Sequence, residues 1–392
     1  MPTIPTAFGV RRAPQQPDWP LPEAAAVVRS ALAARAGLVT EEECRHLTAS
    51  LGQAGRGEAV VLQGGDCAER FADAAPSVVS AKTDQLLALA ATIRHTSGLP
   101  THPVGRLAGQ YAKPRSSERE RLADGRSIPV YRGDAVNSAA YRESARTADP
   151  ARLLLAHDAA ATVLDTVRRS WPDDPSQPRV WCSHEALLLD YEEPLIRAGR
   201  RGPYGSSGHF LWIGDRTRSP YGAHIRLAAT LTNPIGVKLG PGVAPSEAAE
   251  LSRRLNPHGE AGRLTFIVRL GAAHVDDLLP GLVSEVARRG APVLWLCDPM
   301  HGNTVPGPGG RKTRLLRDIA HEVTAFVRIL RRSGQYPGGL HLEMTPEDVD
   351  ECVDDEREPA GDRWPRNYRS ACDPRLNPEQ ARQIVHTFSK HL

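Results

Sequence analysis

Short apolar runs recur along the chain, and a charged or thiol side chain lies within or shortly after each of them. The runs are rich in Val, Ile and Leu and do not alternate polar with apolar residues, which is typical of strands buried on both faces of a parallel sheet. Between most runs, apolar residues recur at the three- and four-residue spacing of a helix face. The eight predicted strands are residues 58–64, 103–107, 179–183, 209–214, 235–239, 264–270, 292–297 and 339–342. The clearest predicted helices are residues 78–93, 152–168, 244–255, 275–288 and 312–331.

This alternation of strand and helix predicts an α/β fold, and eight such units predict a closed (β/α)8 TIM barrel. The first 55 residues lack the pattern and are rich in Pro and then in Ala. We therefore expect residues 1–55 to form an irregular N-terminal arm and helices outside the barrel, and residues 56–392 to form the catalytic barrel. Residues 304–310 and 354–366 are predicted as loops, because Pro, Gly and charged residues break the pattern there.

Composition narrows the classes of function. The chain has 49 Lys and Arg against 46 Asp and Glu, a formal net charge of +3, with the two signs mixed throughout, so no nucleic-acid partner is expected. No apolar run approaches the roughly 18 to 20 residues of a membrane span, and the start lacks a signal-peptide core, so we expect a cytoplasmic protein without a membrane partner. Six widely spaced cysteines without a CxxC pair argue against a disulfide scaffold or a zinc knuckle.

Four potential metal ligands follow the first, seventh and eighth predicted strands or lie just beyond the barrel. They are Cys67, His301, Glu343 and Asp373. The first and eighth strands of a closed barrel are neighbours, so these side chains can converge. One sulfur, one imidazole nitrogen and carboxylate oxygens suit a borderline divalent transition metal, and the residues alone leave Zn²⁺, Mn²⁺, Fe²⁺ and Co²⁺ open. Taken singly, a buried Cys is usually a small hydrophobe, and a buried His or Glu is usually a satisfied structural group.

Positive charges form a second group in the same part of the predicted barrel. They are Arg106, Lys113, Arg115, Arg216, Lys238 and Arg269. Three of them lie within predicted strands, where an unpaired charge is costly, so a bound phosphate or carboxylate is a natural partner. The alternative is ion pairing within the protein, with Asp66, Glu185, Asp190 or Asp298.

Nine segments at these positions resemble the type II 3-deoxy-D-arabino-heptulosonate 7-phosphate (DAHP) synthases. They are distributed over nearly the whole chain after residue 55, and QQPDWP (15–20) fits the family's start. The segments are LQGGDCAERF (62–71), RLAGQYAKPRS (106–116), PVYRGDAVN (129–137), SHEALLLDYE (183–192), WIGDRTR (212–218), NPIGVKLGP (233–241), CDPMHGNT (297–304), GGLHLEMTPEDVDEC (338–352) and ACDPRLNPEQA (371–381).

The resemblance implies a metal-dependent condensation of phosphoenolpyruvate with erythrose 4-phosphate, the first step of the shikimate pathway. By motif match, Cys67, His301, Glu343 and Asp373 hold the metal. Phosphoenolpyruvate binds Arg106, Arg216, Lys238 and Arg269, with Asp215 beside Arg216, while Lys113 and Arg115 face the aldose phosphate. Water then adds at C2, and the sequence leaves Glu185, His184 and Lys238 as candidate proton carriers. We expect Mn²⁺ or Co²⁺ to support turnover, a homodimer, and chorismate mutase as a candidate partner.

Two departures from the family's pattern bear on function. Asp215 stands where the family usually has Glu, which keeps the carboxylate but shortens its reach. Residues 151–180 leave little room for the helices that carry aromatic amino acid feedback in primary metabolism, so the chain resembles the short members that supply secondary metabolism. Two alternatives remain open: an amino-DAHP synthase that uses an aminated aldose phosphate, and a catalytically silent homologue that binds a partner. Cys372 adjoins Asp373, and we hypothesise that it lies near Cys67 and makes the site sensitive to oxidation.

Overall fold

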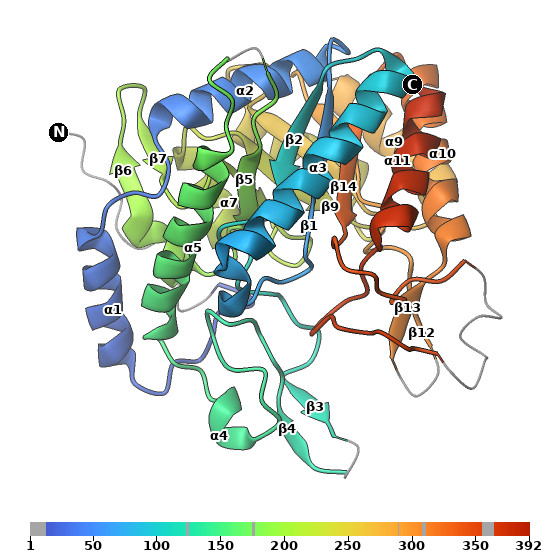
Figure 1. Cartoon of the computed structure of the whole chain (residues 1–392). Helices are drawn as coiled ribbons and strands as arrows, with labels where there is room; N and C mark the ends of the chain where they lie inside the picture. Colours follow the sequence, from blue (N-terminus) through green and yellow to red (C-terminus); the bar gives the residue numbers. More distant parts are fainter. Residues whose placement is uncertain (1–12, 123–124, 175–176, 289, 308–310, 355–363) are drawn as a thin grey trace.

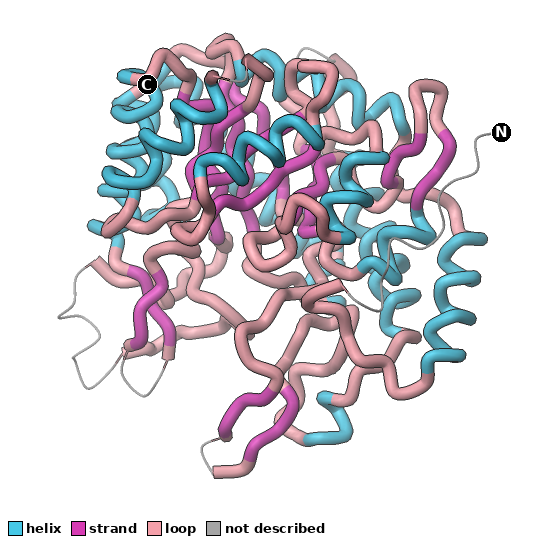
Figure 2. The backbone as a smooth tube through the Cα atoms, turned by 180° about the vertical axis from the view of Figure 1, so that it is seen from behind, coloured by secondary structure: helices cyan, strands magenta, loops and turns pink. Residues whose placement is uncertain are grey.

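Eight parallel strands close into a barrel at the centre of the molecule (Figures 1 and 2). The computed structural model describes residues 13–122, 125–174, 177–288, 290–307, 311–354 and 364–392. Each barrel strand overlaps one of the eight predicted strands, so the predicted (β/α)8 barrel is confirmed. In the order around the barrel, the strands are β1 (Val60–Gly65), β14 (Pro337–Glu343), β11 (Leu294–Cys297), β10 (Leu264–Val268), β9 (Ile235–Leu239), β8 (Phe210–Ile213), β5 (Trp181–Glu185) and β2 (Thr101–Gly105).

Helices surround this barrel, and all five that the periodicity predicts are present. α3, for example, begins at Pro76, whose fixed φ suits the first helical position, and ends before Gly98, which adopts the left-handed conformation at φ +75°. The surrounding helices are α3 (Pro76–Ser97), α5 (Arg152–Arg169), α7 (Ala223–Thr230), α8 (Pro245–Leu255), α9 (Val275–Ala287), α10 (Leu316–Arg332) and α11 (Pro378–His391).

The predicted start of α10 was wrong, and residues 304–306 of the predicted loop before it form a strand. Residues 312–314 form a short strand, β13 (Lys312–Arg314), which pairs antiparallel with β12 (Thr304–Pro306), and the helix begins only at Leu316. The β-branched Thr304, Val305 and Thr313 favour this pairing. Residues 308–310, at the tip, lie outside the described residues, as do residues 355–363 of the other predicted loop.

The N-terminal region packs on the barrel in two places. α2 (Glu41–Gly55) crosses the end where the strands begin (Figure 1), and its Leu47, Leu51 and Ala54 join the apolar cluster of the barrel interior. α1 (Pro22–Ala34) contacts α5 and the single-turn α6 (Leu189–Glu192), which follows β5 where a longer helix would usually cover the barrel.

The arm that precedes α1 is fastened to loops at the opposite end of the barrel. Gln15 Nε2 donates to the carbonyl oxygen of Arg115 (3.1 Å), and its Oε1 accepts from the N–H of Arg115 (2.8 Å). Trp19 Nε1 donates to Asp190 Oδ2 (2.7 Å). Two hairpins extend from this end (Figure 1), one formed by β12 and β13 and the other by β3 (Arg119–Arg121) and β4 (Ser127–Pro129). Among the described residues, no helix is long and apolar enough to span a membrane.

Candidate active site

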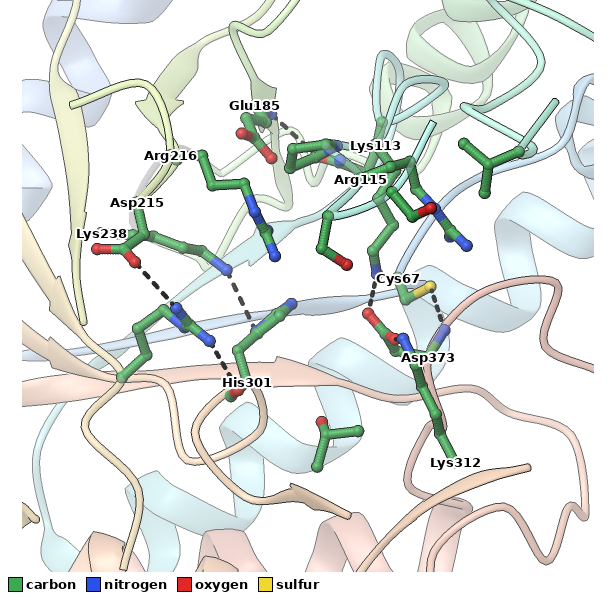
Figure 3. Close-up of a pocket in the computed structure, with 18 of the residues that line it drawn as sticks. Cys67, Lys113, Arg115, Glu185, Asp215, Arg216, Lys238, His301, Lys312 and Asp373 are labelled. Carbon is green, nitrogen blue, oxygen red and sulfur yellow. Dashed lines mark hydrogen bonds and ion pairs between the residues drawn. The ribbon is translucent and has the colours of Figure 1, made fainter. Parts of the chain in front are cut away.

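A cavity of about 350 Å³ opens where the barrel strands end, bounded on one side by residues of the β3–β4 hairpin. Most of the polar residues singled out in the sequence line it, and Figure 3 shows the side chains pointing into it. Eight of its lining side chains are cationic. The charged, thiol and imidazole residues of the lining are Cys67, Arg106, Lys113, Arg115, Arg119, Glu120, Glu185, Asp215, Arg216, Lys238, Arg269, His301, Lys312 and Asp373.

Three of the four predicted metal ligands, Cys67, His301 and Asp373, line this cavity, and the fully buried Glu343 lies beside them. The ligand atoms of Cys67, Glu343 and Asp373 all lie within 4.8 Å of one another. His301 joins them through its Nε2, which is 2.9 Å from Glu343 Oε1. The register of the barrel explains part of this, since Gly65 of β1 pairs with Glu343 of β14 and places the turn at Cys67 beside that carboxylate.

The protonation states of this group suit cation binding. Burial would raise the pKa of the Cys67 thiol, but a hydrogen bond with the Cys372 thiol and the charge of Lys113 outweigh it and lower the pKa to about 7. Burial would also raise the pKa of Glu343, yet His301, Lys113 and Arg314 hold it well below its usual range. A thiolate, an imidazole and carboxylates form a set that fits a borderline divalent metal ion.

Asp298 orients His301 toward the other ligands. Its Oδ2 lies 2.8 Å from His301 Nδ1 and 2.9 Å from Lys238 Nζ. A histidine that donates through Nδ1 to a carboxylate keeps Nε2 available as a ligand. Burial lowers the pKa of His301 despite the nearby Asp298 and Glu343, which favours the neutral imidazole that binds metals.

Several cations pair with the ligand carboxylates. Arg106 is almost fully buried, and its Nη2 lies 3.2 Å from Glu343 Oε1 while its Nε donates to the carbonyl oxygen of Asp66 (2.9 Å). Lys113 forms an ion pair with Asp373 and lies 3.7 Å from Glu343. Arg106 and Lys113 therefore contact both the proposed metal ligands and the cavity.

The opposite wall carries Arg216, Lys238 and Arg269, which were predicted to bind phosphoenolpyruvate, together with Asp215. Arg269 donates from Nη2 to the carbonyl oxygen of His301 (2.7 Å), and its Nη1 lies 3.2 Å from Asp215 Oδ2. Asp215 also accepts from Arg218 Nε (2.9 Å) and from the N–H of Gly240 (3.0 Å). Asp215 thus holds Arg269 in place, while Arg216 is exposed in the cavity wall (Figure 3).

The three candidate proton carriers are placed differently. Glu185 lines the cavity, and its Oε1 is buried without a hydrogen-bond partner among the described residues. Burial raises the pKa of Glu185, although Lys238 and Arg106 act in the opposite direction. Burial likewise lowers the pKa of Lys238. His184, in contrast, does not line the cavity and is buried with Nε2 2.9 Å from Glu192 Oε1.

Two cations near the metal ligands were missed by the sequence reasoning. Lys312 Nζ lies 2.7 Å from Asp373 Oδ1, and the fully buried Arg314 has its Nη2 2.8 Å from Glu343 Oε2. Both belong to β13, which we had predicted as part of a helix. The alternation in Lys312-Thr313-Arg314, with two cations at strand spacing, is the signal that could have placed them on one face.

Comparisons with known proteins agree with the geometry. The chain matches the class-II DAHP synthetase family over residues 4–174 and 173–389. Phospho-2-dehydro-3-deoxyheptonate aldolase of Streptomyces coelicolor is 40% identical over 422 aligned positions, covering 95% of this chain and 94% of that protein. A probable phospho-2-dehydro-3-deoxyheptonate aldolase of Pseudomonas fluorescens is 42% identical, covering 94% of this chain and 92% of that protein.

A third relative and one solved structure also match the chain. Phospho-2-dehydro-3-deoxyheptonate aldolase AroG of Mycolicibacterium smegmatis is 36% identical, covering 96% of this chain and 92% of that protein. The solved structure of phospho-2-dehydro-3-deoxyheptonate aldolase from Francisella tularensis matches with a TM-score of 0.56 at 14% identity, covering 94% of this chain and 96% of that one, which supports the barrel fold alone. The near full-length family match and relatives of this similarity show that the chain belongs to the class-II DAHP synthetase family.

Proposed function

We infer that the protein condenses phosphoenolpyruvate with erythrose 4-phosphate to give DAHP and inorganic phosphate. The observation that carries this inference is a cavity lined by a thiol, an imidazole and a carboxylate, with the buried carboxylate of Glu343 beside them and a group of cations in the same lining, in a chain that belongs to this family. Both substrates are anionic, and a pocket rich in Lys and Arg suits them.

We propose that Cys67, His301, Glu343 and Asp373 hold a divalent metal ion. Such an ion, when bound, acts as a Lewis acid on the aldehyde oxygen of the aldose phosphate. Their mixed donor set supports Mn²⁺ or Co²⁺, as the family resemblance suggests. Asp298 orients His301, and the cations that pair with Glu343 and Asp373 balance the charge of the ligand set.

We assign the anion-binding roles by wall of the cavity. Arg216, Lys238 and Arg269 would hold the phosphate and carboxylate of phosphoenolpyruvate, with Arg106 beneath them, and Asp215 would keep Arg269 in position. Lys113 and Arg115, on the side bounded by the β3–β4 hairpin, would face the phosphate of the aldose.

The bond changes then follow from the substrates. C3 of phosphoenolpyruvate attacks the aldehyde carbon, so a carbon–carbon bond forms, C2 becomes electron-deficient, and the aldehyde oxygen takes up a proton to become a hydroxyl. Water adds at C2, and the bond between C2 and the bridging oxygen then breaks, so that C2 becomes a ketone and inorganic phosphate leaves with the bridging oxygen and the proton of the C2 hydroxyl. The water gives up its other proton when it adds. Glu185 is our candidate for receiving that proton, because it combines a place in the cavity with a buried, unpartnered oxygen. Lys238 is a second candidate, because burial lowers its pKa.

The acceptor and the pathway are finer questions. Asp215 in place of the family's usual Glu leaves the amino-DAHP alternative open, and its ion pair with Arg269 supports a role on the phosphoenolpyruvate side. The short segment 151–180 supports a role in secondary metabolism. The cytoplasmic location, the homodimer and the contact with chorismate mutase, all expected from the sequence, stay predictions.

Phosphate release from phosphoenolpyruvate, measured with erythrose 4-phosphate, its aminated analogue and other aldose phosphates, tests this function. We expect the highest kcat/KM with erythrose 4-phosphate. A preference for the aminated analogue would make the protein an amino-DAHP synthase. No release with any acceptor in the metal-loaded protein would favour the silent homologue.

A further inference from the structure

The segment that carries Asp373 is folded around a single buried carboxylate. Residues 369–375 contain no helix or strand, yet Asp373 must stand beside Cys67 and Glu343 for the proposed metal site to form. Irregular backbone does not fix a side chain by itself, so some other contact must hold this segment. The contact that reaches both ends of the segment is the side chain of Glu351, which is fully buried.

Glu351 accepts hydrogen bonds from both ends of the segment. Its Oε1 accepts from the N–H of Arg369 (3.0 Å) and of Ser370 (2.8 Å), and its Oε2 accepts from the N–H of Arg375 (2.7 Å). The guanidinium of Arg375 donates to the same carboxylate from Nε (3.1 Å) and from Nη2 (2.9 Å). Five donors thus converge on one side chain, and three of them are backbone groups on either side of Asp373.

Arg375 connects the hydrogen-bonded group around Glu351 to the turn that carries Cys67. Its Nη1 donates to Asp66 Oδ1 (2.6 Å), and the other oxygen of Asp66 lies 2.6 Å from Lys82 Nζ. Asp66 directly precedes Cys67 in the chain. The path Glu351, Arg375, Asp66 is therefore a buried, charge-assisted connection between the segments that hold two of the proposed ligands.

Closer to the ligands, the held segment makes contacts that fix their spacing. The N–H of Asp373 donates to Cys67 Sγ (3.2 Å; Figure 3), and Ser370 Oγ donates to the carbonyl oxygen of Asp373 (2.6 Å). Leu376, which directly follows Arg375, donates its N–H to the carbonyl oxygen of Glu343 (2.9 Å). Moving the segment would change the distances from Asp373 to both Cys67 and Glu343.

We propose that Glu351 is a positioning residue of the metal centre, which sets the geometry of Asp373 relative to Cys67 and Glu343 without touching the ion. This inference rests on the metal site of the proposed function. A buried acid with only a structural role would lower the stability of the protein when mutated. If Glu351 is a positioning residue, removing one of its acceptor oxygens should also weaken metal binding in protein that is still folded. Outer partners that orient metal ligands typically change metal affinity by about 10- to 100-fold when mutated.

The test is the Kd for Mn²⁺ of the wild type and of Glu351→Gln, measured by competition with a fluorescent chelator, beside the thermal midpoint of each metal-free protein. Gln keeps the shape but replaces one acceptor oxygen by an amide NH₂ that would face the donors. We expect a Kd about 10- to 100-fold higher for Glu351→Gln at temperatures where both proteins are folded. If Glu351→Gln does not fold, Glu351→Asp, which keeps the charge and shortens the reach, is measured in its place, with a rise of about tenfold expected.

Glu347→Gln is the matched control. Among the described residues, the carboxylate of Glu347 contacts the guanidinium groups of Arg369 (3.0 Å) and Arg375 (3.5 Å), but no backbone N–H of segment 369–375. Its Kd should stay within about twofold of the wild type. An unchanged Kd for the Glu351 variant, with a lowered thermal midpoint, would reduce Glu351 to a structural residue and overturn the inference. If the wild type itself bound no Mn²⁺, the metal site of the proposed function would be wrong, and the inference would fall with it.

Discussion

At the scale of single residues, Glu185 is the group in the cavity best suited to exchange a proton. It lines the cavity, one of its oxygens has no hydrogen-bond partner among the described residues, and burial raises its pKa. His184, its neighbour in the sequence, is engaged with Glu192 outside the cavity. Two adjacent titratable residues therefore have different environments, because successive side chains of a strand point to opposite faces.

This difference predicts the pH dependence of turnover. If Glu185 receives the proton of the added water, it must be ionised, so kcat should fall as the pH is lowered through the pKa of Glu185, which burial raises above the usual range of a glutamate. Glu185→Gln should lose about 10²- to 10⁴-fold in kcat and should no longer show that acidic limb. The measurement is the pH profile of kcat for both proteins. If kcat of Glu185→Gln still fell at low pH as in the wild type, the fall would belong to the titration of another group, and Lys238 would be tested next.

Asp215 is one of the two departures from the family's usual pattern that the sequence comparison by motif predicts. Because its carboxylate holds Arg269 and keeps its charge, erythrose 4-phosphate should remain a substrate of the wild type. Asp215→Glu should change kcat/KM by less than about tenfold, or about 1.4 kcal/mol. Steady-state kinetics with erythrose 4-phosphate and its aminated analogue check this. A wild type that ignored erythrose 4-phosphate, and a variant that gained it, would make Asp215 a specificity switch.

At the scale of secondary structure elements, strand ends explain which parts of the site could be predicted. The strands that carry or precede Cys67, His301 and Glu343 can be recognised from short runs of apolar residues. Once these strands are placed in a closed barrel, their order predicts that the three side chains lie close together. The partners of these residues depend on packing between distant segments. Lys238 pairs with Asp298, which is the ion pairing that the sequence left open as an alternative to a bound anion. No sequence motif near Glu351 indicated its contacts with segment 369–375. The position of Arg314 beside Glu343 was missed because a helix was predicted where a short strand forms.

The two loops that meet at the metal ligands also predict sensitivity to oxidation. The thiols of Cys67 and Cys372 are hydrogen-bonded, and the lowered pKa of Cys67, about 7, supplies a thiolate near neutral pH. A mild oxidant such as diamide, which takes up the two hydrogens, should join them in a disulfide and remove a metal ligand. We expect inactivation that dithiothreitol reverses and that Cys372→Ser resists. Equally rapid inactivation of Cys372→Ser would show that this pair is not responsible.

At the scale of the whole molecule, the protein is one barrel with N-terminal helices that complete it. α2 closes the end where strands begin, α1 contacts α5 and α6 where a longer helix would usually follow β5, and the arm around Gln15 is fastened to the loop of Arg115 beside the cavity. Both helices lie within residues 1–55, the region predicted to form an arm and helices outside the barrel. The sequence could not show that α2 shares the barrel's interior core, since that depends on its docking and not on its periodicity.

The segment between α5 and β5 leaves little room for the helices of a feedback site, and we predict weak feedback control. After α5 ends at Arg169, the described residues before β5 contain turns and extended chain but no further helix. Phe, Tyr and Trp, singly or mixed, should therefore barely change the rate of DAHP formation. Initial rates with each amino acid and with their mixtures check this. Strong inhibition by any mixture at physiological concentration would reveal a regulatory site elsewhere in the molecule.

The central claim is that Cys67, His301, Glu343 and Asp373 bind a metal ion on which the condensation depends. Its most direct test is the rate of phosphate release from phosphoenolpyruvate and erythrose 4-phosphate in chelator-treated protein, before and after Mn²⁺ or Co²⁺ is restored. We predict that chelation abolishes turnover, that either ion restores it, and that Cys67→Ala and His301→Ala stay inactive with metal present. Full activity in a demonstrably metal-free sample would contradict the account.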